Sequence, residues 1–347
     1  MPIIREKLWQ LSLLTLVRVL SLRSLVVLSL STPSLSFVNV NNVDALELTP
    51  VQSTALLVAY WRDVETKRKH QESSSSTLTS PRASLVSDPT ATVLVDTLLS
   101  KESRDAYAAS PIRDVGIDCL ALRTRLIDDW LMRQLSNPSS NEDEVNKRGL
   151  ASKPRQIVNL GAGMDGRPYR LDFEQISTTI FEIDSDPTLL EIKKKVLEDA
   201  GFQQSCPTFS VGANLEDVQS TIEALQKMDD FDSNADTDWI AEGLLEYMDP
   251  TLHHPPLLQM AYDLCGPSSR MIMQVLEPPF GDLFKSKLGA DTLPWKRLVR
   301  AKDIVAVAKD IGWSSATILT GDDLSQKYDK RKIVDLPGYT MVCLEKN

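Results

Sequence analysis

Short apolar runs alternate with amphipathic segments along the second half of the chain, after residue 154. The apolar runs predict strands over residues 156–160, 177–184, 208–213, 238–243 and 270–277. The segments between them repeat apolar residues at helical spacing and predict helices over residues 186–202, 215–228, 254–266 and 301–313. Strands that alternate with helices build a mostly parallel sheet covered on both faces, so the pattern predicts a doubly wound α/β domain. Two later runs, 316–321 and 337–346, predict two more strands as an antiparallel pair.

The first half of the chain has a different pattern, with long amphipathic stretches and few strand-like runs. Residues 46–70 and 112–135 repeat apolar positions at helical spacing, and Thr49 and Pro50 suit the start of the first helix. The Ser-rich stretch 71–84 predicts a flexible loop. Each amphipathic helix needs a partner for its apolar face, and the sheet domain is the only large partner. We therefore expect residues 37–150 to be a helical lid on a Rossmann-like domain of residues 151–347, with a polar boundary over 136–154.

Residues 1–36 form a separate block, rich in Leu, Ser and Val, with basic residues and a single acid, Glu6. Arg18 and Arg23 interrupt the apolar run, which leaves it short of the roughly 20 residues of a membrane-spanning helix. This composition predicts a removable targeting peptide, for an organelle or the secretory pathway. An amphipathic or membrane-anchoring helix on an otherwise cytoplasmic protein is the alternative. We expect membrane contact only through this segment, if it is not cleaved.

Composition narrows the class of protein. Of the 347 residues 42% are hydrophobic and 25% are charged, values that are ordinary for a globular protein. The net charge of −10 disfavours a phosphate-binding surface, so we expect no nucleic-acid partner. Four cysteines without a CxxC pair predict neither a zinc ribbon nor a disulfide framework, and three histidines predict no multi-histidine metal centre.

A glycine loop joins the first predicted strand to the segment that follows it. Residues 161–166 read GAGMDG, a GxGxxG pattern directly after the strand. Glycines at these positions allow a tight turn and the close approach of a ligand to the backbone. Asp184 ends the second predicted strand, where a carboxylate can accept hydrogen bonds from a ribose. The pattern predicts a nucleoside-containing cofactor and does not separate a dinucleotide from S-adenosylmethionine.

Charged residues near the loop favour a cofactor that carries both positive and negative charges. Arg167 and Arg170 oppose the dipole of the helix expected after the loop, so we interpret them as reaching carboxylates. A solvated network of Arg170 with Asp165 or Glu174 is the alternative. Glu242 ends the fourth predicted strand, at the sheet edge where α/β proteins bind ligands. A carboxylate there suits a sulfonium and an α-amino group, although it could simply favour a local helix dipole.

Six segments in the same order resemble the leucine carboxyl methyltransferase family, and its bacterial-type branch in particular. They are STALLVAYWRDVE (53–65), LVSDPTA (85–91), ALRTRLIDDWL (121–131), QIVNLGAGMDGRPYRL (156–171), FEIDSDP (181–187) and WIAEGLLEYM (239–248). The resemblance covers roughly residues 50–345. It implies a Rossmann-like class I methyltransferase fold and S-adenosylmethionine as cofactor.

The resemblance also implies roles for matching residues. Gly161 and Gly163 are expected to line the cofactor, Asp184 to bind its ribose, and Glu242 to lie against its methionine end. Arg123 matches the arginine that meets the cofactor carboxylate.

Further positions follow from the same resemblance. Arg125 is the second candidate for the carboxylate, and Arg167 and Tyr247 are possible acceptor or cofactor contacts. The pair Asn214–Leu215 stands where the family usually has Asp-Leu beside the adenine. Asn214 keeps a carbonyl oxygen for the adenine amino group but lacks the charge, which leaves cofactor affinity at this point open. Gly166 replaces a usual threonine, and we expect the turn to loosen.

The expected reaction is methyl transfer from S-adenosylmethionine to an acceptor oxygen. A carboxylate needs no general base, whereas an alcohol or phenol does. The recognised motifs contain no histidine, which favours the carboxylate of a small metabolite or a protein C-terminus. His253 and His254 are the only histidines near a motif, and we interpret them as part of a helix-entry turn. Two alternatives stay open, an NAD-dependent oxidoreductase and a non-catalytic cofactor-binding member of the same fold, and the sequence does not indicate an oligomeric state.

Overall fold

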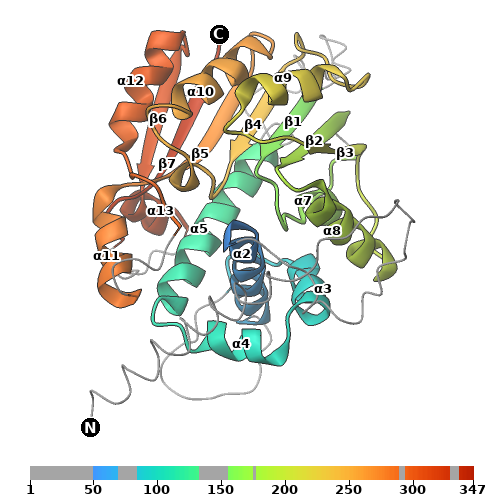
Figure 1. Cartoon of the computed structure of the whole chain (residues 1–347), viewed down its shortest axis with the longest axis vertical. Helices are drawn as coiled ribbons and strands as arrows, with labels where there is room; N and C mark the ends of the chain where they lie inside the picture. Colours follow the sequence, from blue (N-terminus) through green and yellow to red (C-terminus); the bar gives the residue numbers. More distant parts are fainter. Residues whose placement is uncertain (1–49, 69–83, 133–154, 175–176, 289–293, 329–335) are drawn as a thin grey trace, which may run out of the picture. The chain divides into compact units, whose positions relative to one another are not determined.

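The sheet of this protein has seven strands, in the order β3-β2-β1-β4-β5-β7-β6 (Figure 1). The computed structural model describes residues 50–68, 84–132, 155–174, 177–288, 294–328 and 336–347. The strands are β1 (Arg155–Leu160), β2 (Thr178–Asp184), β3 (Thr208–Gly212), β4 (Thr237–Ala241), β5 (Arg270–Leu276), β6 (Ser315–Thr320) and β7 (Tyr339–Glu345). Every predicted strand is confirmed. The first five are mutually parallel, which also confirms the predicted mostly parallel sheet.

The two last strands differ from the expected hairpin-like pair. They are antiparallel to each other, as predicted, but helix α13 (Gly321–Tyr328) lies between them in the chain. Strand β7 also pairs antiparallel with β5, so it is inserted between β5 and β6. Only β7 therefore runs against the other strands, because β6, antiparallel to β7, has the same direction as β5.

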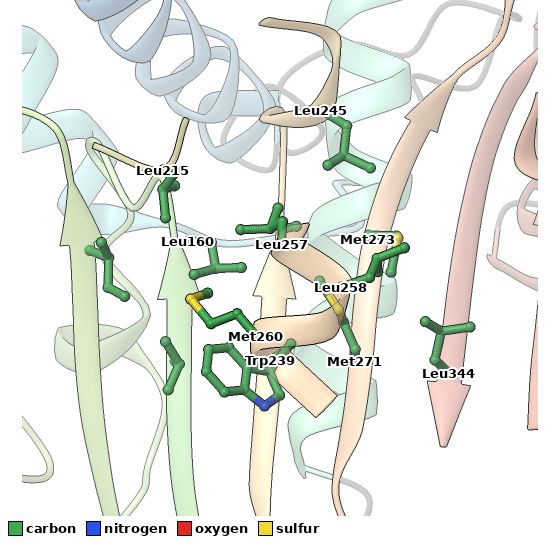
Figure 2. Packing of buried hydrophobic residues seen from close by; sticks show 14 of the residues in the cluster. Leu160, Leu215, Trp239, Leu245, Leu257, Leu258, Met260, Met271, Met273 and Leu344 are labelled. Atoms are coloured by element: carbon green, nitrogen blue, oxygen red, sulfur yellow. The ribbon is translucent and has the colours of Figure 1, made fainter. Parts of the chain in front are cut away.

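The central strands of the sheet are buried on both faces because helices cover the sheet. All five residues of β4 are buried: Trp239, Ile240 and Ala241 are apolar, and Asp238 is paired with Arg155 and Arg270. Figure 2 shows the cluster on one face, where Trp239, Met271 and Met273 of the strands meet Leu257 and Met260 of helix α10. The Trp239 side chain is fully buried. This cluster fixes the strand ends relative to one another.

The predicted helices of the sheet domain are confirmed, and each is a few residues shorter than predicted. They are α8 (Pro187–Asp199), α9 (Val218–Gln226), α10 (His254–Asp263) and α12 (Ala301–Ile311). Asp186 and Asp217 cap the first two, each accepting a backbone N–H two or three residues ahead. Helices α11 (Pro278–Leu288) and α13 were not predicted. Two adjacent prolines open α11 and a glycine opens α13, and these residues weaken the periodic signal.

The described part of the front contains four helices, namely α2 (Pro50–Lys67), α3 (Pro89–Leu98), α4 (Lys101–Ala108) and α5 (Arg113–Met132). The predicted helices 46–70 and 112–135 correspond to α2 and α5. Helix α2 packs against α3 and α5, and Gly116 of α5 makes room for the Trp61 ring. A Cβ atom at Gly116 would lie 2.6 Å from that ring. Residues 50–347 form one compact unit, so the described front helices and the sheet fold together.

Several expectations concern residues outside the described ranges. The predicted targeting peptide of residues 1–36, most of the Ser-rich stretch 71–84 and the boundary near residue 150 all fall there. The lid role of the front also stays a prediction. None of the described helices combines the length and apolar character that crossing a bilayer requires.

Candidate cofactor site

The glycine loop lies at the carboxyl end of β1, where the chain turns between β1 and β2. Gly161 and Gly163 have φ of 69° and 46°, the left-handed region that favours glycine. The backbone N–H groups of Gly161 and Ala162 donate to the Ile183 carbonyl at 2.8 and 2.9 Å. The loop is thus bound directly to the end of β2. The helix expected after it, α7 (Arg167–Arg170), is only one turn long.

Asp184 lies beside this loop, as the sequence predicted. Its Oδ2 atom accepts the Gly163 N–H at 2.9 Å, and its Oδ1 atom accepts the Asp186 N–H at 3.2 Å. The side chain is only partly buried. Each carboxylate oxygen has a second lone pair, so Asp184 can bind hydroxyl groups while it holds the loop.

Asn214 and Leu215 follow β3, at the same edge of the sheet. Leu215 is buried in the core cluster. Asn214 is exposed, and its Oδ1 atom accepts the Glu216 N–H at 3.1 Å. That oxygen has a second lone pair, so both it and the amide NH₂ group can still bind a ligand. The carboxyl ends of β1, β2 and β3 therefore bring the loop, Asp184 and Asn214 to neighbouring strand ends.

Glu242 lies directly after β4 and contacts two of the predicted arginines. Its Oε1 atom accepts the Arg123 Nε–H at 2.7 Å, and its Oε2 atom accepts an Arg167 Nη1 hydrogen at 2.7 Å. Arg123 also donates to the Gln274 side chain of β5. Arg123 comes from the front helix α5, and Arg167 is the first residue of α7, directly after the glycine loop. The structure thus brings the predicted residues Arg123, Arg167 and Glu242 together.

These contacts belong to one buried network, which we call the arginine network. It contains four arginines and four carboxylates, each with a side chain at most 12% exposed. Its members are Arg62, Asp88, Arg123, Asp128, Asp165, Arg167, Arg170 and Glu242. Their ion pairs form an unbroken chain from α2 and α3, through the glycine loop and α5, to the end of β4. The formal charge of the network is balanced.

The network sets the ionisation of its carboxyl groups. Burial alone would raise the pKa of Glu242, but the Arg123 and Arg167 guanidinium groups lower it to about 2. Burial opposes ionisation of Asp165 too, and Arg167 and Arg62 hold the pKa of Asp165 far below its usual range. Both groups are therefore carboxylates at neutral pH. The site presents a fixed negative charge at Glu242 and a fixed positive charge at Arg123.

Arg170 reaches carboxylates, as interpreted, and these belong to the protein itself. It binds Asp128 at 2.6 Å and lies 3.6 Å from Asp88, and neither Asp165 nor Glu174 is its partner. The alternative of a solvated network is wrong, because the side chain is only 5% exposed. Asp88 and Asp128 lie 82 and 42 residues away in sequence, so short spacings could not identify them.

The remaining candidates take different positions. Arg125 projects from α5 away from the network, 48% exposed and paired with Asp129 at 3.0 Å. Tyr247 lies in the short helix η4 (Leu245–Tyr247), with its hydroxyl 3.3 Å from the Thr54 hydroxyl of α2. Burial raises the pKa of Tyr247 to about 12. The described structure therefore places Tyr247 against helix α2, whereas Arg125 lies on an exposed side of α5.

The two histidines have structural contacts. The Nε2 atom of His254 lies 3.0 Å from the Leu245 carbonyl, and burial lowers its pKa. The Nδ1 atom of His253 accepts the Asp249 N–H at 3.2 Å. This agrees with the interpretation as a helix-entry turn at the start of α10.

Gly166 corrects the expectation of a loosened turn. A Cβ atom at Gly166 would collide with the Thr90 side chain of α3, whose Cβ atom would be 2.8 Å away. Thr90 is fully buried and donates its hydroxyl to Asp88. A threonine side chain therefore does fill this space, but it comes from α3.

The variant Gly166→Thr should lower the free energy of unfolding by about 1–3 kcal/mol, because two side chains would compete for one space. Combining it with Thr90→Gly should recover part of that loss. Urea denaturation of the two single variants and the double variant measures the coupling. Strictly additive losses would mean that the two positions do not share this space.

Comparisons with known proteins agree with this geometry. The sequence profile of the family described as "Leucine carboxyl methyltransferase" matches residues 55–255. The chain belongs to the leucine carboxyl methyltransferase family. A protein of Mycobacteroides abscessus, provisionally named an S-adenosyl-L-methionine-dependent methyltransferase, is 30% identical over 233 residues, which are 66% of each chain. One of Mycolicibacterium paratuberculosis with the same name is 29% identical over 69% of this chain and 68% of its own.

Solved structures are more distant. A Thermobifida fusca protein provisionally named a methyltransferase aligns with a TM-score of 0.46 and 15% identity, over 74% of this chain and 92% of its own. An S-adenosylmethionine-dependent methyltransferase of Archaeoglobus fulgidus aligns with a TM-score of 0.39 and 13% identity, over 64% of this chain and 93% of its own.

As a member of the leucine carboxyl methyltransferase family, the chain has the fold and cofactor of an S-adenosylmethionine-dependent methyltransferase. The observed site fits that cofactor. A loop with two positive-φ glycines admits a ligand, Asp184 can take a ribose, and Glu242 and Arg123 offer opposite charges to a zwitterion. Nothing in these comparisons supports the NAD-dependent oxidoreductase that the bare glycine pattern allowed.

Proposed function

We propose that this protein transfers a methyl group from S-adenosylmethionine to a carboxylate oxygen of a small metabolite or of a peptide C-terminus. The observation that supports it most is the pair of opposite charges formed by Arg123 and Glu242 at the carboxyl edge of β4, where Arg123 Nε lies 2.7 Å from Glu242 Oε1. Family membership supports the methyl donor. The carboxylate acceptor is our own inference from the chemistry of the site.

Each residue has a defined task in this proposal. Asp184 accepts hydrogen bonds from the ribose hydroxyls while it keeps the glycine loop in place. Glu242 accepts from the α-amino group of the methyl donor, and Arg123 donates to its α-carboxylate. Leu215 offers an apolar surface, and Asn214 a side-chain amide, to the adenine.

S-adenosylmethionine, when bound, supplies a sulfonium that is already an excellent leaving group. The protein then has to position an acceptor oxygen and exclude water, which can supply several kcal/mol of the barrier. The acceptor carboxylate needs no proton removed. This suits a site in which both nearby histidines are engaged with the backbone. Front helices α2 and α5 supply the residues that would exclude water.

Two measurements test the proposal. Calorimetric titration with S-adenosylhomocysteine should show binding to the wild type and strong weakening in Gly163→Val, because valine adds a branched side chain 3.1 Å from Ala55 at a left-handed backbone position. Gly201→Val is the matched control, since Gly201 also has positive φ but nothing lies within 4 Å of its Cβ position. Equal affinity in Gly163→Val and the wild type would contradict the loop assignment.

The acceptor is tested with methyl-labelled S-adenosylmethionine and a panel of carboxylic acids, phenols and peptides. A carboxyl methyl ester releases labelled methanol in mild alkali, whereas an ether or an N-methyl product does not. We expect alkali-labile label from at least one carboxylic acid or peptide. Alkali-stable product alone would contradict the carboxylate acceptor, and cofactor binding without transfer to any acceptor would favour the non-catalytic alternative.

A further inference from the structure

Glu246 is a buried carboxyl group that the functions described above do not use. It lies in η4, four residues after Glu242, and the residue is 7% exposed. Its Oε2 atom has no hydrogen-bond partner among the described residues. Its backbone carbonyl accepts the Lys296 N–H at 2.7 Å, which covers the turn from the other side. A buried, unsatisfied carboxyl oxygen is costly and calls for an explanation.

Glu246 lies at the methionine end of the proposed cofactor site. A Cβ atom placed on Gly243 would be 3.9 Å from Glu246 Oε1 and 3.4 Å from Arg123 Nη1, so both side chains lie around this glycine. Burial raises the pKa of Glu246 to about 7, and the backbone N–H of Glu246 and then Arg123 partly oppose that rise. The carboxyl group therefore changes its charge near neutral pH.

The groups that face Glu246 have other partners. From α5, Arg123 binds Glu242 and Gln274. Within η4, the Tyr247 hydroxyl lies next to that of Thr54. From β7, the buried Tyr339 hydroxyl donates to the Cys119 carbonyl at 2.9 Å. Burial raises the pKa of both tyrosines, so neither carries charge at neutral pH.

Charge balance indicates what the group can do. The arginine network already pairs four arginines with four carboxylates, and Glu246 is not one of them. The amino and carboxylate charges of the methyl donor cancel each other, whereas its sulfonium adds one positive charge. An ionised Glu246 supplies the one negative charge that this ligand lacks.

We propose that Glu246 distinguishes the positively charged methyl donor, S-adenosylmethionine, from its neutral product, S-adenosylhomocysteine. This inference rests on the proposed cofactor site. When the sulfonium is present, it stabilises the ionised form of Glu246, and the two attract each other through a low-dielectric interior. After methyl transfer the thioether is neutral, the attraction is lost, and the product is released more easily.

The sign of the pH dependence follows directly. Bound S-adenosylmethionine lowers the pKa of Glu246 below its value of about 7 in the free protein. Affinity for the donor should therefore rise as the pH increases from about 6 to 8, with proton release on binding below pH 7. Affinity for S-adenosylhomocysteine should change little over the same range, because a neutral sulfur does not shift the equilibrium.

The experiment compares the two ligands in calorimetric titrations of the full chain at pH 6, 7 and 8, in buffers of different ionisation enthalpy. In the wild type we expect donor affinity to increase about tenfold across this range, and protons to be released with the donor only. Glu246→Gln should remove both effects and leave S-adenosylhomocysteine affinity unchanged. Glu198→Gln is the control, since Glu198 is a half-exposed glutamate in a surface pair with Lys194.

Several results would overturn the inference. One is equal proton release for both ligands in the wild type, and another is an unchanged donor-to-product affinity ratio in Glu246→Gln. The first measurement needs no variant and does not depend on how the substitution folds. If neither ligand binds the wild type, the proposed cofactor site fails. If both bind without pH-dependent discrimination, only the role of Glu246 fails.

Discussion

Replacement of Arg167 by methionine is expected to lower the free energy of unfolding by about 3–5 kcal/mol. Arg167 is 2% exposed and binds three carboxylates, with its Nε atom 2.8 Å from Asp128 and its Nη1 atom 2.6 Å from Asp165 and 2.7 Å from Glu242. Methionine fills much of the same volume but leaves buried negative charge without its partner. The expected loss therefore comes from uncompensated charge and not from a cavity.

Arg125→Met is the matched control for Arg167→Met. Arg125 is also an arginine in an ion pair, but it is about half exposed, and such pairs contribute about 0–1 kcal/mol. Urea denaturation followed by circular dichroism compares the two variants with the wild type. A similar decrease in the free energy of unfolding in both variants would show that burial of the arginine network does not determine its contribution to stability.

Asp184→Ala is expected to weaken S-adenosylhomocysteine binding about 100-fold or more. Each charge-assisted hydrogen bond to a ribose hydroxyl contributes about 1.5–3 kcal/mol, and the variant loses the acceptor for both hydroxyls. It also removes the carboxylate that accepts the Gly163 N–H at 2.9 Å, so the loop loses a constraint. Calorimetric titration gives the affinity, and circular dichroism tests whether the fold is retained.

Asp199→Ala is the control, because it removes an aspartate at the other end of α8, the helix that follows Asp184. Asp199 is the last residue of α8, where it forms an exposed pair with Lys195 at 2.8 Å, and its loss should leave affinity unchanged. A less than threefold weakening in Asp184→Ala, with the fold intact, would contradict ribose binding by this residue.

Much of the sheet could be predicted because its signals are local. A strand buried on both faces carries adjacent apolar residues, as Trp239, Ile240 and Ala241 do in β4, and its end marks the ligand-binding edge. That is why Asp184 and Glu242 could be located from sequence. Helix α3 also carried a local signal, since Asp88 caps it and Pro89 begins it. Helix α3 was nevertheless not predicted.

The arginine network could not be predicted in this way, because its pairs join distant segments. Arg62 and Asp165 lie on α2 and the glycine loop, and no spacing rule connects them. The oxygen of Asn214 turned out to bind a neighbouring backbone N–H, which residue type alone does not reveal. Glu246 was overlooked for the same reason, since its importance depends on burial and on Arg123 and not on a motif.

The position of β7 has a consequence for how the chain reaches its native state during synthesis. Strands β5 and β6 leave the ribosome before β7, yet in the finished sheet they lie on either side of it. Until β7 inserts, β5 presents an open edge of unpaired backbone groups and β6 has no partner in the sheet. If the earlier strands pair before β7 is made, the nascent sheet exposes a strand edge that can pair with other chains, and chaperones protect intermediates of this kind.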